Sequence, residues 1–222
     1  MNKELDIYRH FSDEFIERFE KKSFKRNEII IPAENLDDIS IYYILKGKVS
    51  IFSTSDNGRT FLIDELGPGE FVGKFSQLRK HSFFSEGIAM TDCEMLDLTK
   101  YKDELLEDMG FSLYFHKKTT NRIYYMYKTS MARDLFTYKE LLAYCLVIMA
   151  DDENNVVASD KHIRWKLNIS ERNYFYLLKR LGQLGVISKE KKKIHILDMD
   201  FLEKAASSVL KFMDDSSEEL KL

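Results

Sequence analysis

The spacing of apolar residues changes within the first half of the chain. At the start they recur at helical spacing, which predicts an amphipathic helix over about Leu5–Glu20. Over Phe24–Leu98, short apolar runs such as Ile29–Ile31 alternate with turn residues instead. The pair Asn57-Gly58 fits a tight hairpin, because both residues tolerate positive φ. Strands at this even spacing are typical of an antiparallel barrel or jelly roll.

The helical period returns after the predicted barrel. A short helix is expected over Tyr101–Asp108, and a long one over about Phe111–Ala132, where neither Pro nor Gly interrupts the pattern. Alternating spacings of four and three place one set of side chains along a single face of the long helix. This face consists of Leu113, Lys117, Thr120, Tyr124, Tyr127 and Met131.

That face has two interpretations. Lys117 and Thr120 make it a poor hydrophobic seam, which leaves open that the helix packs only on its own barrel. The alternative, which we favour, is a dimer interface along the same face. The residues expected to form the dimer contacts are Leu113, Thr120, Tyr124, Tyr127 and Met131.

A third helical segment opens a second domain. Thr137 and Glu140 have the spacing of a capping box, in which each side chain bonds to the backbone of the other residue. The apolar helix that follows, Leu141–Met149, ends at a polar break over Asp151–Asn155. We therefore expect an α+β chain in three parts. These are a jelly-roll domain at residues 1–110, a dimerisation helix and hinge at residues 111–136, and a second domain at residues 137–222.

Two capped helices follow one another in this second domain. Ser159 can cap a helix over about Asp160–Leu167, and Ser170 can cap one over about Glu171–Leu184. Between them, Asn168 tolerates the left-handed conformation that a sharp turn requires. Two helices joined by a turn of about three residues form a helix-turn-helix.

A lysine-rich turn comes after the second helix. The apolar runs Gly185–Ile187 and Ile194–Ile196 flank it, which is the pattern of a β-hairpin, here called the wing. The lysines expected at its tip are Lys189, Lys191, Lys192 and Lys193. Ammonium groups there can meet phosphate, a contact that positions a protein on DNA without reading sequence.

The second helix is the recognition helix by its position, and the first turns of such a helix touch base edges in the major groove. Arg172 is suited to donate two hydrogen bonds to guanine, and Glu171 is suited to accept a hydrogen bond from the amino group of cytosine. Phe175 or Tyr176 can pack on a thymine methyl group. A subdomain of this shape that binds protein is the alternative. The expected DNA-binding residues are Ser159, Ser170, Glu171, Arg172, Asn173, Phe175, Tyr176, Lys179, Lys191, Lys192 and Lys193.

Positive charge is concentrated in the segment that contains the predicted helix-turn-helix and wing. The whole chain has a formal net charge of −3. Residues 155–197 contain ten Lys or Arg and three acids, a net charge of +7, whereas residues 1–154 carry −6 and residues 198–222 carry −4. A basic block inside an acidic protein is the electrostatic footprint of a polyanion site, although charge alone also fits a solvated basic face.

The remaining composition argues against other classes of protein. The 222 residues contain no stretch of 18 uncharged apolar side chains, and the charged start lacks the apolar region of a signal peptide. We therefore expect a cytoplasmic protein without a membrane span. Cys93 and Cys145 are too few for an iron–sulfur cluster, and the five histidines are scattered. No catalytic residue, enzyme activity or metal site is expected.

In this order, the barrel, long helix and winged helix resemble the catabolite-activator (Crp/Fnr) family of bacterial transcription regulators. Residues 44–49 (ILKGKV) look like its barrel motif, residues 66–73 (LGPGEFVG) like the turn into its effector cassette, and residues 89–94 (AMTDCE) like the strand after that cassette. Ser159–Leu181 and the wing match its DNA-binding part. The resemblance implies a homodimer on a two-fold operator in double-stranded DNA, with RNA polymerase as a further partner.

The effector cassette departs from that of the family's cyclic-AMP binders. They carry a glutamate for the ribose where this chain has Lys74, and an arginine for the cyclic phosphate near Phe83 or Phe84. A buried cyclic phosphate needs a charged or hydrogen-bonding partner, so we expect no cyclic-AMP binding of the usual kind and assign no cofactor. A pocket for another effector would be lined by Gly73, Lys74, Phe75, Ser76, Phe83, Phe84, Ser85 and Tyr124.

The side chains of the cassette are compatible with more than one kind of effector. An acidic or aromatic ligand would fit the cassette, and so would no ligand, with the aromatic side chains simply filling the barrel. Arg172, Phe175 and Tyr176 depart from the recognition helix usual in the family, so an operator sequence cannot be borrowed from relatives. The rival function is a small-molecule sensor that acts through protein partners.

Overall fold

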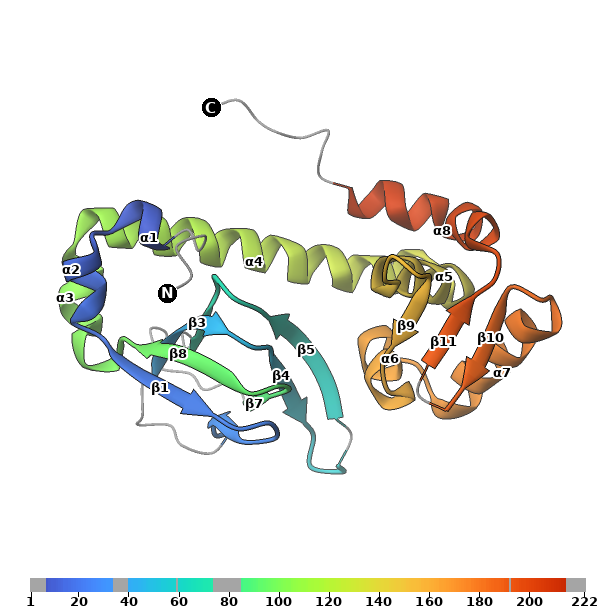
Figure 1. Ribbon diagram of the computed structural model, residues 1–222, viewed down its shortest axis with the longest axis horizontal. Helices are drawn as coiled ribbons and strands as arrows, with labels where there is room; N and C mark the ends of the chain where they lie inside the picture. Colours follow the sequence, from blue (N-terminus) through green and yellow to red (C-terminus); the bar gives the residue numbers. More distant parts are fainter. Residues whose placement is uncertain (1–6, 34–39, 59, 74–84, 192, 215–222) are drawn as a thin grey trace. The chain divides into compact units, whose positions relative to one another are not determined.

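The computed structural model describes residues 7–33, 40–58, 60–73, 85–191 and 193–214. The chain divides into two compact units, Met1–Tyr124 and Tyr125–Leu222, and a single long helix runs through the boundary. Figure 1 shows the helices and strands of both units. Among the described residues, no helix combines the length and the apolar character needed to cross a membrane.

The N-terminal unit is a sandwich of two antiparallel sheets. In chain order its elements are α1 (Ile7–His10), α2 (Asp13–Glu17), β1 (Glu20–Phe24), β2 (Ile29–Ile31), β3 (Ile41–Lys46), β4 (Val49–Thr54), β5 (Thr60–Leu66), β6 (Phe71–Gly73), β7 (Glu86–Ala89), β8 (Cys93–Asp97), a 3₁₀ turn (Thr99–Tyr101), α3 (Lys102–Glu107) and the first part of α4 (Met109–Leu135). The sheets have the strand orders β1-β8-β3-β6 and β2-β7-β4-β5. This arrangement confirms the predicted jelly roll.

Strand β3 contributes side chains to two cores. Tyr42 and Ile44 pack between the sheets, together with Met95 of β8. Tyr43, on the opposite face, packs against Phe71 with ring centroids 5.1 Å apart, in the core that the helices share with this sheet. Because successive side chains of a strand point to opposite faces, a strand buried on both faces is apolar throughout. The uninterrupted apolar run of β3 follows from this.

The start of the chain differs from the predicted single helix. Two short helices replace it, because the Ser12 hydroxyl caps α2 by accepting from the backbone N–H of Phe15 at 3.2 Å. The phenylalanines of this segment still lie on the same side of the chain. The Phe11 and Phe15 rings stack with their centroids 4.9 Å apart. The hairpin predicted at Asn57-Gly58 is present, since β4 and β5 pair antiparallel up to Thr54 and Thr60, but its loop is longer than a two-residue turn. Of the pair Asn57-Gly58, only Gly58 has a positive φ, of 77°.

Helix α4 packs one face of its first half on the barrel. Phe111, Tyr114 and Phe115 are buried there. Further along, Arg122 forms an ion pair with Asp64 of β5 at 2.5 Å and donates to the Phe71 carbonyl oxygen at 2.8 Å. This face of the helix is therefore occupied by contacts within its own unit.

The C-terminal unit contains the second part of α4, followed by a series of shorter elements. These are α5 (Tyr138–Met149), β9 (Asn155–Val157), α6 (Asp160–Leu167), α7 (Glu171–Gln183), β10 (Ile187–Glu190), β11 (Lys193–Ile196) and α8 (Met199–Met213). Helix α5 begins at the predicted capping box of Thr137 and Glu140. Strand β9 and helix α8 were not expected from the sequence. Helix α8 starts at a cap formed by Asp198 and buries Leu202 and Val209 in the core shared with α5.

Candidate nucleic-acid interface

Helices α6 and α7 begin and end where the sequence predicted. The Ser159 hydroxyl accepts from the backbone N–H of His162 at 3.1 Å, which satisfies one of the donors left at a helix start. Asn168 ends α6 with a φ of 49°, in the left-handed region. The Ser170 hydroxyl then accepts from the backbone N–H of Asn173 at 3.3 Å and starts α7. Together these features form the predicted helix-turn-helix.

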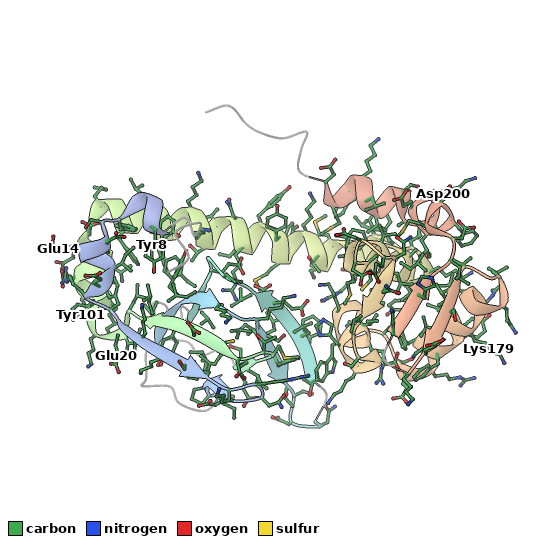
Figure 2. All side chains as sticks on the ribbon, in the orientation of Figure 1. Tyr8, Glu14, Glu20, Tyr101, Lys179 and Asp200 are labelled. Carbon is green, nitrogen blue, oxygen red and sulfur yellow. The ribbon has the colours of Figure 1, made fainter. Side chains whose placement is uncertain are left out.

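Helix α7 has one buried and one exposed face. Tyr174, Leu177 and Leu178 are buried in the core of the unit. The Tyr174 hydroxyl donates to the Asp160 carboxylate of α6 at 2.9 Å. Burial and this hydrogen bond raise the pKa of Tyr174, which keeps the phenol protonated. The exposed face carries Glu171, Arg172, Asn173, Phe175, Tyr176 and Lys179. Figure 2 shows Lys179 on the outside of this unit.

Strands β10 and β11 form the predicted wing. They pair antiparallel, from Ile187 and Ile196 at the base to Glu190 and Lys193 beside the turn. Strand β9, paired with β11, extends the hairpin to a three-stranded sheet. Lys191 lies exposed in the turn, and Lys193 lies exposed at the start of β11. Lys192 is outside the described residues.

Lys189 does not join the other lysines at the tip of the wing, which corrects the sequence-based expectation. It belongs to β10, and its ammonium donates to Oδ1 of Asp160, the oxygen that also accepts from Tyr174. The ammonium also lies 5.0 Å from the centroid of the Phe175 ring. The sequence pattern gives no sign of this contact, because Asp160 and Lys189 are distant along the chain and belong to different elements.

Glu171 has a partner that the sequence did not suggest. Its carboxylate forms an ion pair with Arg164 of α6 at 2.5 Å. The pair links the two helices of the helix-turn-helix. Arg164 contacts Oε2, so the Glu171 carboxylate can keep this pair and accept from cytosine at Oε1. Arg172, beside it on α7, is exposed and faces away from the core of the unit.

Most of the predicted effector pocket lies outside the described residues, namely Lys74, Phe75, Ser76, Phe83 and Phe84. Gly73 ends β6 and pairs with Ile41 of β3. A Cβ atom on Gly73 would lie 2.3 Å from the carbonyl oxygen of Ser40, so close packing of the strands itself requires a glycine there. Ser85 is half-buried before β7, and Tyr124 is exposed on α4.

The predicted dimer face is largely exposed. Leu113 is 64% exposed and Tyr127 is 65% exposed, values that are high for large apolar side chains on a helix. Thr120 and Tyr124 are exposed as well, and Met131 is half-buried. At about 100° per residue, this face lies opposite the one that packs on the barrel.

Part of the N-terminal unit matches a known domain family. Residues 21–104 match the cyclic nucleotide-binding domain family. The chain has no significant match among curated proteins.

Solved structures match over most of the chain. One is TTHA1359, a transcriptional regulator of the CRP/FNR family from Thermus thermophilus, with a TM-score of 0.72 and 18% identity over 85% of this chain and 98% of that one. Another is TTHB099, a CRP-family regulator from the same organism, with a TM-score of 0.71 and 18% identity over 84% and 96% of the two chains. A third is the c-di-GMP-responsive regulator CLP of Xanthomonas campestris, with a TM-score of 0.71 and 16% identity over 83% and 96%.

Proposed function

From the CRP/FNR fold of this chain and its cyclic nucleotide-binding domain at residues 21–104, we propose a DNA-binding transcription regulator that acts as a homodimer. The observation that carries the proposal is the helix-turn-helix of α6 and α7, with a wing behind it and a net charge of +7 over residues 155–197. Such a charge excess on a helix-turn-helix favours a polyanion over a protein partner.

One set of side chains would contact phosphates, and another would contact base edges. Lys191, Lys193 and Lys179 are exposed cations suited to phosphate, which fixes the register of the protein on the duplex. Arg172 lies in the first turn of α7, where its guanidinium would meet base edges in the major groove. Ser159 and Ser170 contribute by capping the two helices, and Asn173 lies on the exposed face beside Arg172.

Salt dependence tests the proposal directly. The affinity for a short duplex of mixed sequence should fall steeply with added salt, because each phosphate that is neutralised releases a bound counterion. In Lys191→Ala, the slope of log K against log salt concentration should become shallower by about 0.9 for each phosphate that the variant no longer neutralises. Fluorescence anisotropy of labelled DNA across a salt series measures both slopes.

Lys211→Ala is the matched control for this experiment. Lys211 is also an exposed lysine of the C-terminal unit, but it lies on α8. Its removal changes the net charge equally and should leave the slope unchanged. Binding that is independent of salt, or no binding at low salt, would refute the DNA-binding function and favour a sensor that acts through protein partners.

The exposed face of α4 is the proposed dimer interface. Leu113, Tyr124 and Tyr127 lie on the side of the helix away from Phe111 and Tyr114, which pack on the barrel. Contact between two such faces would remove apolar surface from water, at a gain of roughly 25 cal/mol per Å². A two-fold dimer would also present two recognition helices to the two halves of an operator.

Tyr127→Glu is expected to weaken the dimer at least tenfold, because it places an unpaired carboxylate in an apolar contact. Sedimentation equilibrium measures the dissociation constant. Asn121→Glu is the control, since Asn121 is exposed on the same helix but about 100° from the centre of the proposed face. An unchanged dissociation constant in Tyr127→Glu would place the interface elsewhere.

The controlling signal is proposed to differ from cyclic AMP. The support comes from the resemblance to the cyclic-AMP binders, which places Lys74 at the ribose contact and Phe83 or Phe84 near the phosphate contact. A calorimetric titration that finds micromolar binding of cyclic AMP would contradict this part of the proposal.

A further inference from the structure

A cluster of four side chains joins the wing to the recognition helix. Asp160, at the first position of α6, accepts from the Lys189 ammonium of β10 and from the Tyr174 hydroxyl of α7, both at Oδ1. Charge-assisted hydrogen bonds of this kind are shorter and stronger than neutral ones. Because Tyr174 is fully buried, the cluster is anchored to the core at one end and reaches the surface at the other.

The surface end of the cluster is the Phe175 ring. The Lys189 ammonium lies 5.0 Å from the centroid of this ring, within the range of a cation–π interaction. The Tyr174 ring contacts it with centroids 5.3 Å apart at an interplanar angle of 62°. Phe175 is nevertheless 42% exposed. Two neighbours therefore hold the ring while leaving part of it open to a ligand.

Tyr176, the other aromatic residue on the exposed face, is held less closely. It is 56% exposed. Its neighbour is Arg180 of the same helix, whose guanidinium carbon lies 6.0 Å from the ring centroid and whose Nη1 reaches the hydroxyl at 3.5 Å. That contact is internal to α7. The cluster that contains Phe175, by comparison, has members on α6, α7 and β10. The fold therefore constrains the Phe175 ring more tightly than the Tyr176 ring.

Resting on the proposed DNA-binding function, we propose that Phe175 is the aromatic residue that reads sequence, by packing on a thymine methyl group, and that Lys189 is its positioning residue. Lys189 then acts through Phe175 and Asp160 and contacts no phosphate. A side chain already held in its bound geometry loses less conformational entropy on binding, which is why the orientation of Phe175 matters for affinity. The wing, in turn, contributes to sequence reading without touching a base.

The first experiment needs no DNA. In an NMR spectrum of the full chain, the ε-methylene protons of Lys189 should be shifted upfield by the ring current of Phe175. In Phe175→Leu the shift should fall to the smaller part caused by the Tyr174 ring, whose centroid lies 5.8 Å from the ammonium. It should disappear in Asp160→Asn, which releases Lys189, and it should persist in Tyr176→Leu. A Lys189 methylene at its free-chain position in the unaltered protein, with intact Trp165 fluorescence to show that the unit is folded, would overturn the positioning role.

The second experiment uses operator fragments that the unaltered protein selects from genomic DNA, with a mixed-sequence duplex as reference. Phe175→Leu should weaken operator binding about tenfold, the usual cost of one misread base pair, and should relax the preference at a thymine. Lys189→Met should do the same, and the double variant should be no weaker than either single one. Lys189→Arg, which keeps the cation, should restore binding, and Tyr176→Leu should add to Phe175→Leu independently.

The salt slope separates a positioning role from a phosphate contact. Lys189→Met should leave the slope on mixed-sequence DNA unchanged, in contrast to Lys191→Ala. A slope reduced by about 0.9 in Lys189→Met, or effects of Lys189→Met and Phe175→Leu that simply add, would overturn the proposal. Absence of any DNA binding by the unaltered chain would refute the proposed function and the reading role of Phe175 together, while the methylene shift decides separately whether Lys189 positions the ring.

Discussion

Gly47→Ala is expected to lower the free energy of unfolding of the N-terminal unit by about 3 kcal/mol or more. Gly47 has a φ of 98°, in a region that side chains strain to adopt. A Cβ atom there would lie 2.5 Å from the Cys93 sulfur and 2.6 Å from the Asp92 carbonyl oxygen. Backbone strain and overlap with the chain before β8 therefore act together, and β8 is a central strand of its sheet.

Urea denaturation followed by circular dichroism measures this loss. Gly58→Ala is the matched control, because Gly58 also has a positive φ, of 77°, but a Cβ atom there meets nothing within 4 Å. It should cost only the strain of the left-handed backbone, about 1 kcal/mol. Trp165, the single tryptophan of the chain, lies on α6 and reports on the C-terminal unit during the same titration. Equal losses in the two variants would show that the close approach to β8 is unimportant.

Arg172→Ala is expected to weaken binding to a selected operator by about 10- to 100-fold, the range for one bidentate contact to a base. Binding to mixed-sequence DNA should weaken much less, because only one of many positive charges is removed. The ratio of the two affinities, measured by anisotropy at one salt concentration, isolates the contribution to sequence reading.

Arg180→Ala provides the charge-matched control for Arg172→Ala. Arg180 is also exposed on α7 but lies in its last turn, away from the end that enters the groove in helix-turn-helix proteins. It should lower both affinities slightly and leave their ratio unchanged. A ratio that Arg172→Ala leaves unaltered would remove Arg172 from the residues that read bases.

The sequence predicted the parts of the fold that depend on residues close together along the chain. Ser159, Ser170 and Thr137 each cap a helix by bonding to a backbone N–H three residues ahead, so residue type and spacing locate the helix start. Asn168 ends α6 because asparagine tolerates the left-handed backbone. The strands of the barrel were found in the same way, by apolar runs between turn residues.

The parts that escaped prediction depend on contacts between distant residues. Strand β9 is too short to show alternation, and it exists because β11 offers it a partner. Helix α8 lies in an acidic stretch whose charge obscures its apolar face. The contact of Lys189 with Asp160 arises from the way the wing folds back on α6, and no spacing along the chain encodes it. The single helix expected at the start was wrong because Ser12 offers a second cap inside it.

Gly73 is required by the barrel itself. Because the backbone of Ser40 leaves no room for a side chain at this position, the glycine is needed to assemble β3 and β6 whether or not anything binds beside them. The glycine at the start of the cassette-like motif is thus required by the packing of the strands. A chain that keeps this packing of β3 on β6 must therefore keep the glycine, whatever residues follow it.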